Sequence, residues 1–121
     1  MTLEEKLNDL NQMILKGEIL ESMDKYYHPD CIVIEKNDVV ASNLKQAKDR
    51  ESDLFEGVEA WLKSEIVSTA VGESVTMTEW HYEYKHKDLG HKKFDQVAVQ
   101  HWKDGKIISD RILCAVLNKN A

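Results

Sequence analysis

The sequence predicts an α+β fold in which three helices precede a run of long antiparallel strands. The chain has 121 residues, 42% of them hydrophobic, which is enough for a single domain with its own core. Apolar residues recur at helical spacing up to Gly57 and alternate along extended segments after it, so the two halves differ in their hydrophobic period. Helices followed by strands favour an α+β architecture over a parallel sheet.

Two helices are predicted before residue 28. Thr2 and Glu5 match a capping box, in which each side chain bonds the other residue's backbone, and Gly17 ends the first helix. The second helix covers residues 18–27 and ends at His28, because a residue that precedes proline avoids helical backbone angles. The apolar positions that indicate these helices are Leu3, Leu7, Leu10, Ile14 and Leu15, then Ile19, Leu20, Met23, Tyr26 and Tyr27.

A short strand and a third helix follow. The β-branched run "CIVIE", residues 31–35, is typical of a strand, and a shorter strand is expected around residues 39–40. Asn43 can cap the third helix, with Gln46 at the third position after it, and Gly57 ends the helix. The helix is highly charged, and its few apolar positions are Leu44, Ala47, Leu54 and Phe55.

Four long strands are predicted over residues 58–72, 74–87, 92–103 and 106–117. Because successive strand residues point to opposite faces, the last three strands define two sets of side chains. One face carries Trp80, Tyr82, Tyr84, Phe94, Gln96, Ala98, Gln100, Trp102, Ile108, Asp110, Ile112 and Cys114. The opposite face carries His81, Val97, Val99, His101, Ile107, Arg111 and Leu113, together with Glu79 and Glu83.

Aliphatic residues on both faces predict that both faces are covered. An antiparallel sheet with one solvated face alternates cleanly between apolar and polar residues, and this sheet does not. Three helices can cover only one face, so we expect a second copy of the chain on the other. The sequence therefore predicts a homodimer through the sheet, with a dimer face made of His81, Val97, Val99, His101, Arg111 and Leu113.

Charge and composition limit the partners. A net charge of −6 argues against binding to nucleic acid or to an anionic membrane surface. No apolar run approaches the roughly 20 residues that span a bilayer, and the N-terminus lacks the features of a signal peptide. Cys31 and Cys114 lie in apolar runs, so we expect two reduced, buried thiols and a cytoplasmic location.

Three segments resemble a known superfamily. They are "YYHPDCIVIE" at 26–35, "TEWHYEY" at 78–84 and "QVAVQHWKDGKI" at 96–107. They resemble SnoaL-like, ketosteroid-isomerase-like domains of the nuclear transport factor 2 superfamily, and the match covers almost the whole chain as one SnoaL-like domain over 1–121. The resemblance implies a cystatin-like cone, in which a curved antiparallel sheet wraps around three N-terminal helices and encloses a deep apolar pocket.

Two carboxylates are the catalytic candidates. Aligned on the isomerase pattern, Glu35 falls at or beside the general base, and Asp110 lies on the face that resembles the pocket lining. A carboxyl in an apolar cone has a raised pKa because burial disfavours its charge, which suits proton transfer. The alternatives are a solvated Glu35 or one paired with Lys36, and an Asp110 paired with a cation at the cone mouth.

The isomerase pattern is incomplete in this chain. Ala98 occupies the position of the family's second acid, and Asn11 falls near the position of a helix-one tyrosine. Neither supplies the strong donor that stabilises an enolate. His86 and His91 lack the further ligands of a metal site, so no metal and no cofactor is expected. The residues predicted to line the pocket are Tyr27, Trp80, Tyr82, Gln96, Ala98, Gln100, Trp102, Ile112 and Cys114.

Two classes of function are consistent with these residues. The first is a domain that binds a small hydrophobic molecule in the cone without turnover, which the missing enolate donors favour. The second is a cofactor-independent isomerase or cyclase that acts on a hydrophobic carbonyl compound, which the pocket carboxylates Glu35 and Asp110 favour.

Overall fold

The computed structural model describes residues 1–116 and contains three helices and one six-stranded sheet. The helices are α1 (Leu3–Leu15), α2 (Ile19–Tyr26) and α3 (Leu44–Glu56). The strands are β1 (Tyr27–Glu35), β2 (Asp38–Ala41), β3 (Val58–Val71), β4 (Val75–His86), β5 (Gly90–Lys103) and β6 (Lys106–Val116). The predicted fold class is confirmed, and Leu117 of the last predicted strand lies outside the described residues.

The helix ends follow the sequence signals. Thr2 and Glu5 form the predicted capping box at α1, where the Glu5 amide donates to the Thr2 hydroxyl at 3.1 Å. The Asn43 side chain accepts from the Gln46 amide at 2.8 Å and caps α3. These bonds satisfy amides that have no partner inside the helix.

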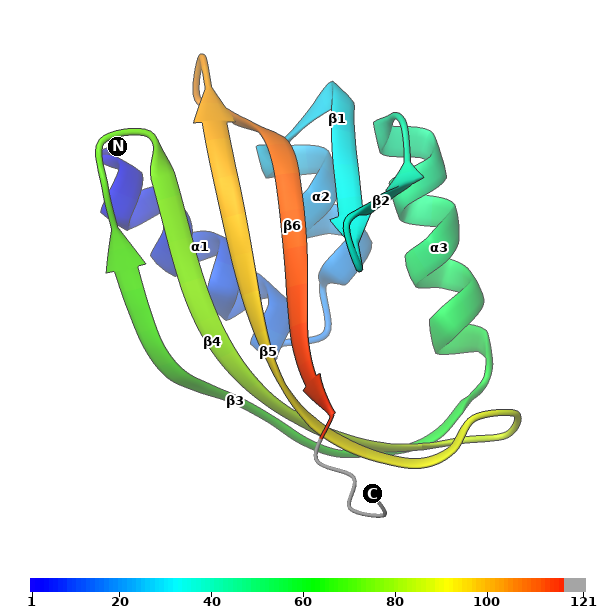
Figure 1. Cartoon of the computed structure of the whole chain (residues 1–121). Helices are drawn as coiled ribbons and strands as arrows, with labels where there is room; N and C mark the ends of the chain where they lie inside the picture. Colours follow the sequence, from blue (N-terminus) through cyan, green and yellow to red (C-terminus); the bar gives the residue numbers. More distant parts are fainter. Residues whose placement is uncertain (117–121) are drawn as a thin grey trace.

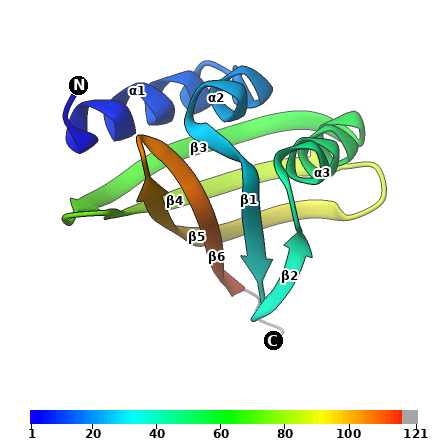
Figure 2. The ribbon, with the colours of Figure 1, turned by 90° about the horizontal axis from the view of Figure 1, so that it is seen from above.

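The sheet is strongly curved, open and mixed, with strand order β2-β1-β6-β5-β4-β3. Every neighbouring pair is antiparallel except β1 and β6, which run parallel. All three helices lie on the concave side of the sheet (Figures 1 and 2). The parallel pair also moves a predicted boundary: β1 begins at Tyr27, four residues before the expected strand, because Tyr27 already pairs with Ile107 of β6.

A β-bulge moves one residue to the other face of the sheet from the one that simple alternation predicts. The register shifts between His101 and Trp102, so Trp102 lies opposite Ile107 and Ile108 is the extra residue. An extra residue reverses the alternation of every position beyond it. The sequence-based placement of Ile107 on the same face as Val97 and Val99 is therefore wrong: its exposed fraction is 0% and it lies in the core with Trp102.

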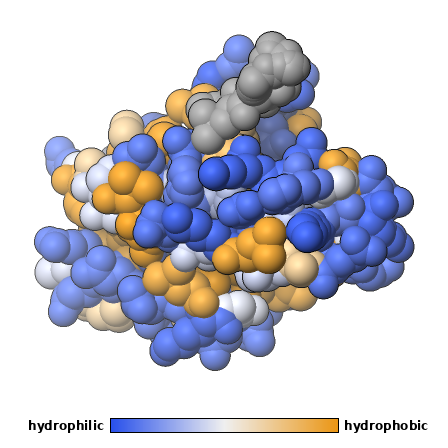
Figure 3. All heavy atoms as spheres, turned by 90° about the horizontal axis from the view of Figure 1, so that it is seen from below, coloured by the Kyte–Doolittle hydropathy of each residue, from blue (hydrophilic) through white to orange (hydrophobic). Residues whose placement is uncertain are grey.

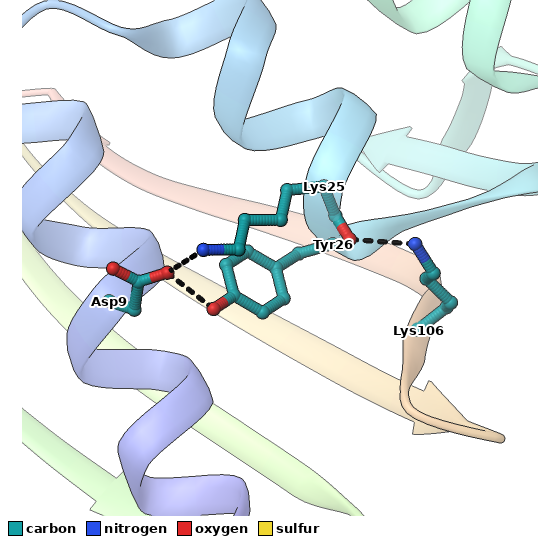
Figure 4. A network of polar contacts seen from close by, with 4 residues as sticks. All are labelled: Asp9, Lys25, Tyr26 and Lys106. Atoms are coloured by element: carbon teal, nitrogen blue, oxygen red, sulfur yellow. Dashed lines mark hydrogen bonds and ion pairs between the residues drawn. The ribbon is translucent and has the colours of Figure 1, made fainter. Parts of the chain in front are cut away.

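The core fills the space between the helices and one end of the sheet. Its buried members are Leu7, Leu10, Met23, Tyr26, Tyr27, Cys31, Ala41, Ala47, Trp102 and Ile107. A polar cluster closes this end (Figure 4). Asp9 of α1 accepts from the Lys25 ammonium at 2.7 Å and from the Tyr26 hydroxyl at 2.5 Å. Lys106 donates to the Lys25 carbonyl at 2.7 Å, so the cluster ties both helices to the start of β6.

The convex face carries the six residues predicted to form a dimer interface. The β4–β5–β6 register aligns His81 with Asp95, Val97 with Leu113, Val99 with Arg111 and His101 with Ser109. Two of the polar members already have partners within the chain, because His81 pairs with Asp95 and Arg111 donates to Asn37. Seen from below, the molecule shows separate groups of hydrophobic residues among hydrophilic ones (Figure 3).

Neither cysteine of the chain forms a disulfide. Cys31 is buried as predicted, but Cys114 is exposed, so the expectation of two buried thiols is wrong for the second. The reason is its position two residues before the end of β6, at the end of the sheet that lies away from α1 and α2 (Figure 1). Over residues 1–116 no helix is long and apolar enough to cross a bilayer.

Candidate functional site

A cavity of about 380 Å³ lies between the helices and the concave face of the sheet. Among the residues that line it are eight of the nine predicted pocket residues: Tyr27, Trp80, Tyr82, Gln96, Ala98, Gln100, Ile112 and Cys114. Both candidate carboxylates, Glu35 and Asp110, line it as well. The ninth predicted residue, Trp102, does not line the cavity, because it is packed in the hydrophobic core with Tyr26 and Ile107.

Aromatic rings form one wall of the cavity. Trp80 and Tyr82 of β4 stack with ring centroids 5.4 Å apart and planes 9° from parallel. Trp61 of β3 lies 6.0 Å from the Tyr82 ring and 5.0 Å from the Tyr84 ring. Sequence reasoning missed Trp61, because β3 has three irregularities in its pairing with β4 and simple alternation does not hold along a bulged strand.

Asp110 is the most buried charged group of the site. Its exposed fraction is 5%, and its Oδ2 accepts from the Tyr27 hydroxyl and, at 3.5 Å, from the Gln100 amide. Burial raises the pKa of Asp110 to about 6, although the two hydrogen bonds act in the opposite direction. Its second oxygen, Oδ1, is buried and has no partner among the described residues.

A chain of hydrogen bonds fixes the donors that face Asp110. Trp102 Nε1 donates to Thr76 Oγ1 at 2.9 Å, and the Thr76 hydroxyl donates to Gln100 Oε1 at 3.3 Å. Gln100 Nε2 is thereby directed at Tyr27 Oη, 3.3 Å away, and at Asp110. Trp102, although outside the cavity, therefore orients the amide of Gln100.

Glu51 of α3 is a second buried acid in the cavity, and it was not among the predicted site residues. It lines the cavity, and burial, followed by the charges of Asp110 and Glu35, raises its pKa to about 7. The signal was present in the sequence: Glu51 follows Leu44 and Ala47 at helical spacing and precedes Leu54, so it occupies the apolar stripe of α3. A carboxyl on such a stripe points to the same side as its apolar neighbours.

Glu35 occupies a different environment from the desolvated one that was expected. Its carboxylate accepts from Arg50 Nη2 at 3.0 Å, and its side chain is 42% exposed. Glu35 is thus an ion-paired residue at the edge of the cavity, and its partner is Arg50 of α3 and not the neighbouring Lys36. Asp110 and Glu51 are the carboxyls that the fold removes from water.

The two departures from the isomerase pattern both line the cavity. Ala98 is 4% exposed and supplies no polar group. Asn11 of α1 is 3% exposed and donates through Nδ2 to Thr78 Oγ1 at 3.2 Å, so this amide hydrogen is already used. The donors beside Asp110 are instead Tyr27 and Gln100. Within residues 1–116, no group of three or more His, Cys, Asp or Glu side chains is placed to hold a metal ion.

Solved structures with this fold support the resemblance. A protein from Mesorhizobium loti described as a SnoaL-like polyketide cyclase superimposes with a TM-score of 0.83 at 19% identity, over 93% of this chain and 99% of that one. An NTF2-like protein from Burkholderia thailandensis gives 0.77 at 11% identity, over 93% and 90%. A ketosteroid-isomerase-like protein from Catenulispora acidiphila, solved with trimethylamine, gives 0.64 at 10% identity, over 78% and 73%.

No protein-family model matches the sequence, and no curated protein matches it significantly. At identities below 20% the structural likeness concerns the fold. The chain therefore has the same fold as these SnoaL-like, NTF2-like and ketosteroid-isomerase-like structures, and the predicted resemblance is confirmed at the level of the fold.

Proposed function

We propose that the chain is a small-molecule-binding domain whose ligand occupies the cavity between the helices and the sheet. The observation that carries the proposal is the composition of the cavity, which combines an aromatic wall with a few fixed polar groups at Asp110, Gln100 and Tyr27. A volume of about 380 Å³ falls within the range of roughly 300–1,000 Å³ that small-molecule sites occupy.

A cavity-filling variant tests this proposal. We expect cyclic ketones and aromatic alcohols of about ten heavy atoms to change the tryptophan fluorescence, because Trp61 and Trp80 line the cavity. Ala98→Leu inserts a larger side chain into the cavity and should weaken binding at least tenfold. Ala70→Leu, on an exposed part of β3, is the matched control and should bind like the wild type. Equal affinities in the two variants would place the ligand elsewhere.

A second candidate is cofactor-independent proton transfer on a hydrophobic carbonyl compound, of the isomerase or cyclase kind. Asp110 supports it, because a carboxyl with a pKa near 6 is suited to exchange a proton near neutral pH. Tyr27 is the donor beside it. The exposure and ion pair of Glu35 favour Asp110 over Glu35 as the base.

Deuterium exchange tests this second candidate. The α-protons of 3-cyclohexenone in D₂O should exchange faster in the presence of the protein, with a rate that rises through pH 6 as Asp110 loses its proton. Asp110→Asn should lower the exchange rate by about 10²–10⁴, the usual contribution of a general base, whereas Glu35→Gln should change it little. An unchanged rate in Asp110→Asn would exclude Asp110 as the base.

We also propose that two copies associate through the convex face, and that the protein works in the cytoplasm. Val97 and Leu113 support the first proposal, because these paired apolar residues lie on the side of the sheet that no helix covers, and Leu113 is 48% exposed. The two free thiols support the second. Sedimentation of the purified chain tests the first proposal, and a monomer at micromolar concentration would contradict it.

A further inference from the structure

We propose that the cavity selects an organic cation, a protonated amine joined to an aromatic or cyclic apolar body, and holds its nitrogen beside the Asp110 carboxylate. The inference rests on the proposed binding of a small molecule in this cavity and assigns the charge of that ligand. Three features of the cavity carry it: an excess of acidic side chains, one buried carboxylate oxygen without a partner, and the aromatic wall.

The charges of the lining are unbalanced. Asp110, Glu51 and Glu35 are its acidic members, and Arg50 is the one lysine, arginine or histidine among the residues that line the cavity. Arg50 is paired with Glu35 at 3.0 Å. Asp110 and Glu51 form no ion pair within residues 1–116, so the cavity holds two carboxyls for which the described part of the chain supplies no cation.

Asp110 has one buried carboxylate oxygen without a hydrogen-bond partner among the described residues. Its Oδ2 already receives the Tyr27 hydroxyl and the Gln100 amide, whereas Oδ1 receives nothing from the described residues. A buried carboxylate is unfavourable because its charge is not balanced, and a missing hydrogen bond adds to this cost. A positively charged N–H donor balances the charge and also supplies the hydrogen bond. An ammonium group at Oδ1 is the ligand group that satisfies this atom best.

Two hydrogen-bond donors stabilise the charged form of Asp110 against burial, which raises its pKa to about 6, so the carboxyl is ionised at pH 8. Tyr27 and Gln100 both direct donors at the carboxyl, and donors stabilise a carboxylate and not a carboxylic acid. The Gln100 amide cannot turn its oxygen toward Asp110 without losing the bond from Thr76. At pH 8 Asp110 is a carboxylate, which accepts hydrogen bonds and offers no donor to a carbonyl oxygen.

The opposite wall suits the rest of a cationic ligand. Trp61, Trp80 and Tyr82 form a stacked aromatic surface that contacts an apolar body and, through the negative face of each ring, attracts a cation. Burial, and then the charges of Glu51 and Asp110, raise the pKa of the Tyr82 hydroxyl, which keeps this side chain neutral. Carboxylates on α3 and β6 therefore share the cavity with the rings of β3 and β4.

Three ligands of similar shape and different charge test the inference by titration calorimetry at pH 8. They are 2-phenylethylamine as the cation, 2-phenylethanol as the neutral analogue and 3-phenylpropionate as the anion. We expect the amine to bind at least tenfold more tightly than the alcohol, and the anion to bind most weakly. An alcohol that binds as tightly as the amine, or an anion that binds more tightly, overturns the inference.

Variants assign the effect to the cavity carboxyls. Asp110→Asn should lower the affinity for the amine at least tenfold and change the affinity for the alcohol less than threefold. Glu51→Gln should change both affinities in the same direction, and it serves as the test if Asp110→Asn does not fold. Asp53→Asn, on the exposed side of α3, is the matched control and should leave both affinities unchanged. Amine binding that survives in both cavity variants overturns the inference.

The outcomes also separate this inference from the proposed function. If the alcohol binds at least as well as the amine and Ala98→Leu abolishes its binding, the cavity is a ligand site without a preference for cations, and only the inference fails. If none of the three ligands binds, the inference fails. The proposed function then fails too if the ketone and alcohol panel likewise gives no binding that depends on Ala98.

Discussion

Replacing Asp110 with asparagine should change how the stability of the protein depends on pH. The pKa of Asp110 is about 6 in the folded protein against an ordinary value of 3.8. The folded state therefore holds this proton more tightly than the unfolded state does. The resulting stabilisation is complete below pH 3.8 and is lost as the pH rises through 6.

The size of the effect follows from the difference between the two pKa values. A difference of about two pKa units, each equivalent to about 1.4 kcal/mol, corresponds to about 3 kcal/mol in the free energy of unfolding. Most of this, about 2 kcal/mol, falls between pH 4.5 and pH 8. Asparagine cannot ionise, so the variant does not lose this free energy as the pH rises. Its free energy of unfolding should therefore increase relative to that of the wild type between pH 4.5 and pH 8.

Urea denaturation of both proteins, followed by tryptophan fluorescence at one protein concentration, measures the difference. Subtracting the wild-type curve from that of Asp110→Asn removes most of the contribution of the groups that titrate in both proteins. Any constant change due to the new amide appears as an offset that does not depend on pH. A difference that stays flat within about 0.5 kcal/mol between pH 4.5 and pH 8 would show that Asp110 is not desolvated, and our account of the site would fail.

Four further substitutions test the packing, the assembly and one helix end. Trp80→Ala should lower the free energy of unfolding by about 3–5 kcal/mol, because Trp80 is 2% exposed, whereas Trp61→Ala should cost less, because Trp61 is 45% exposed; equal losses in urea denaturation would contradict this. Val97→Glu should convert a sedimenting dimer to monomer, since it puts a charge in the proposed interface, and an unaffected dimer would indicate another interface. Thr2→Ala should lower stability by about 1 kcal/mol through loss of the cap, and a loss below about 0.2 kcal/mol in thermal unfolding would show that the first turn is frayed.

Much of the fold could be predicted because its signals are local. Capping residues, glycines and hydrophobic period lie within a few positions of the elements that they define, as Thr2 and Asn43 illustrate. The start of β1 could not be predicted, because it depends on pairing with β6, a strand near the other end of the chain. Ile107 was placed on the wrong face for a related reason: no glycine or other sequence signal indicates the bulge opposite Trp102.

The site could be predicted in part. Strict alternation along the unbroken portions of β4, β5 and β6 placed Asp110 on the same face as the other residues with which these strands line the cavity. It could not select Arg50 as the partner of Glu35, because that contact joins two elements whose relative placement the sequence leaves open. Glu51 was overlooked because acidic residues are abundant on α3 and most of them lie in solvent.

The parallel pairing of β1 with β6 has a consequence for the order of folding. Tyr27 and Asp110 meet only when the earliest and the latest strands lie side by side. Contacts between segments so distant in the chain require the closure of a long loop, and domains rich in such contacts fold slowly. During synthesis on the ribosome, α1 and α2 emerge long before β6. One edge of β1 therefore stays unpaired until β6 has been made. The cavity is thus among the last parts of the molecule to form.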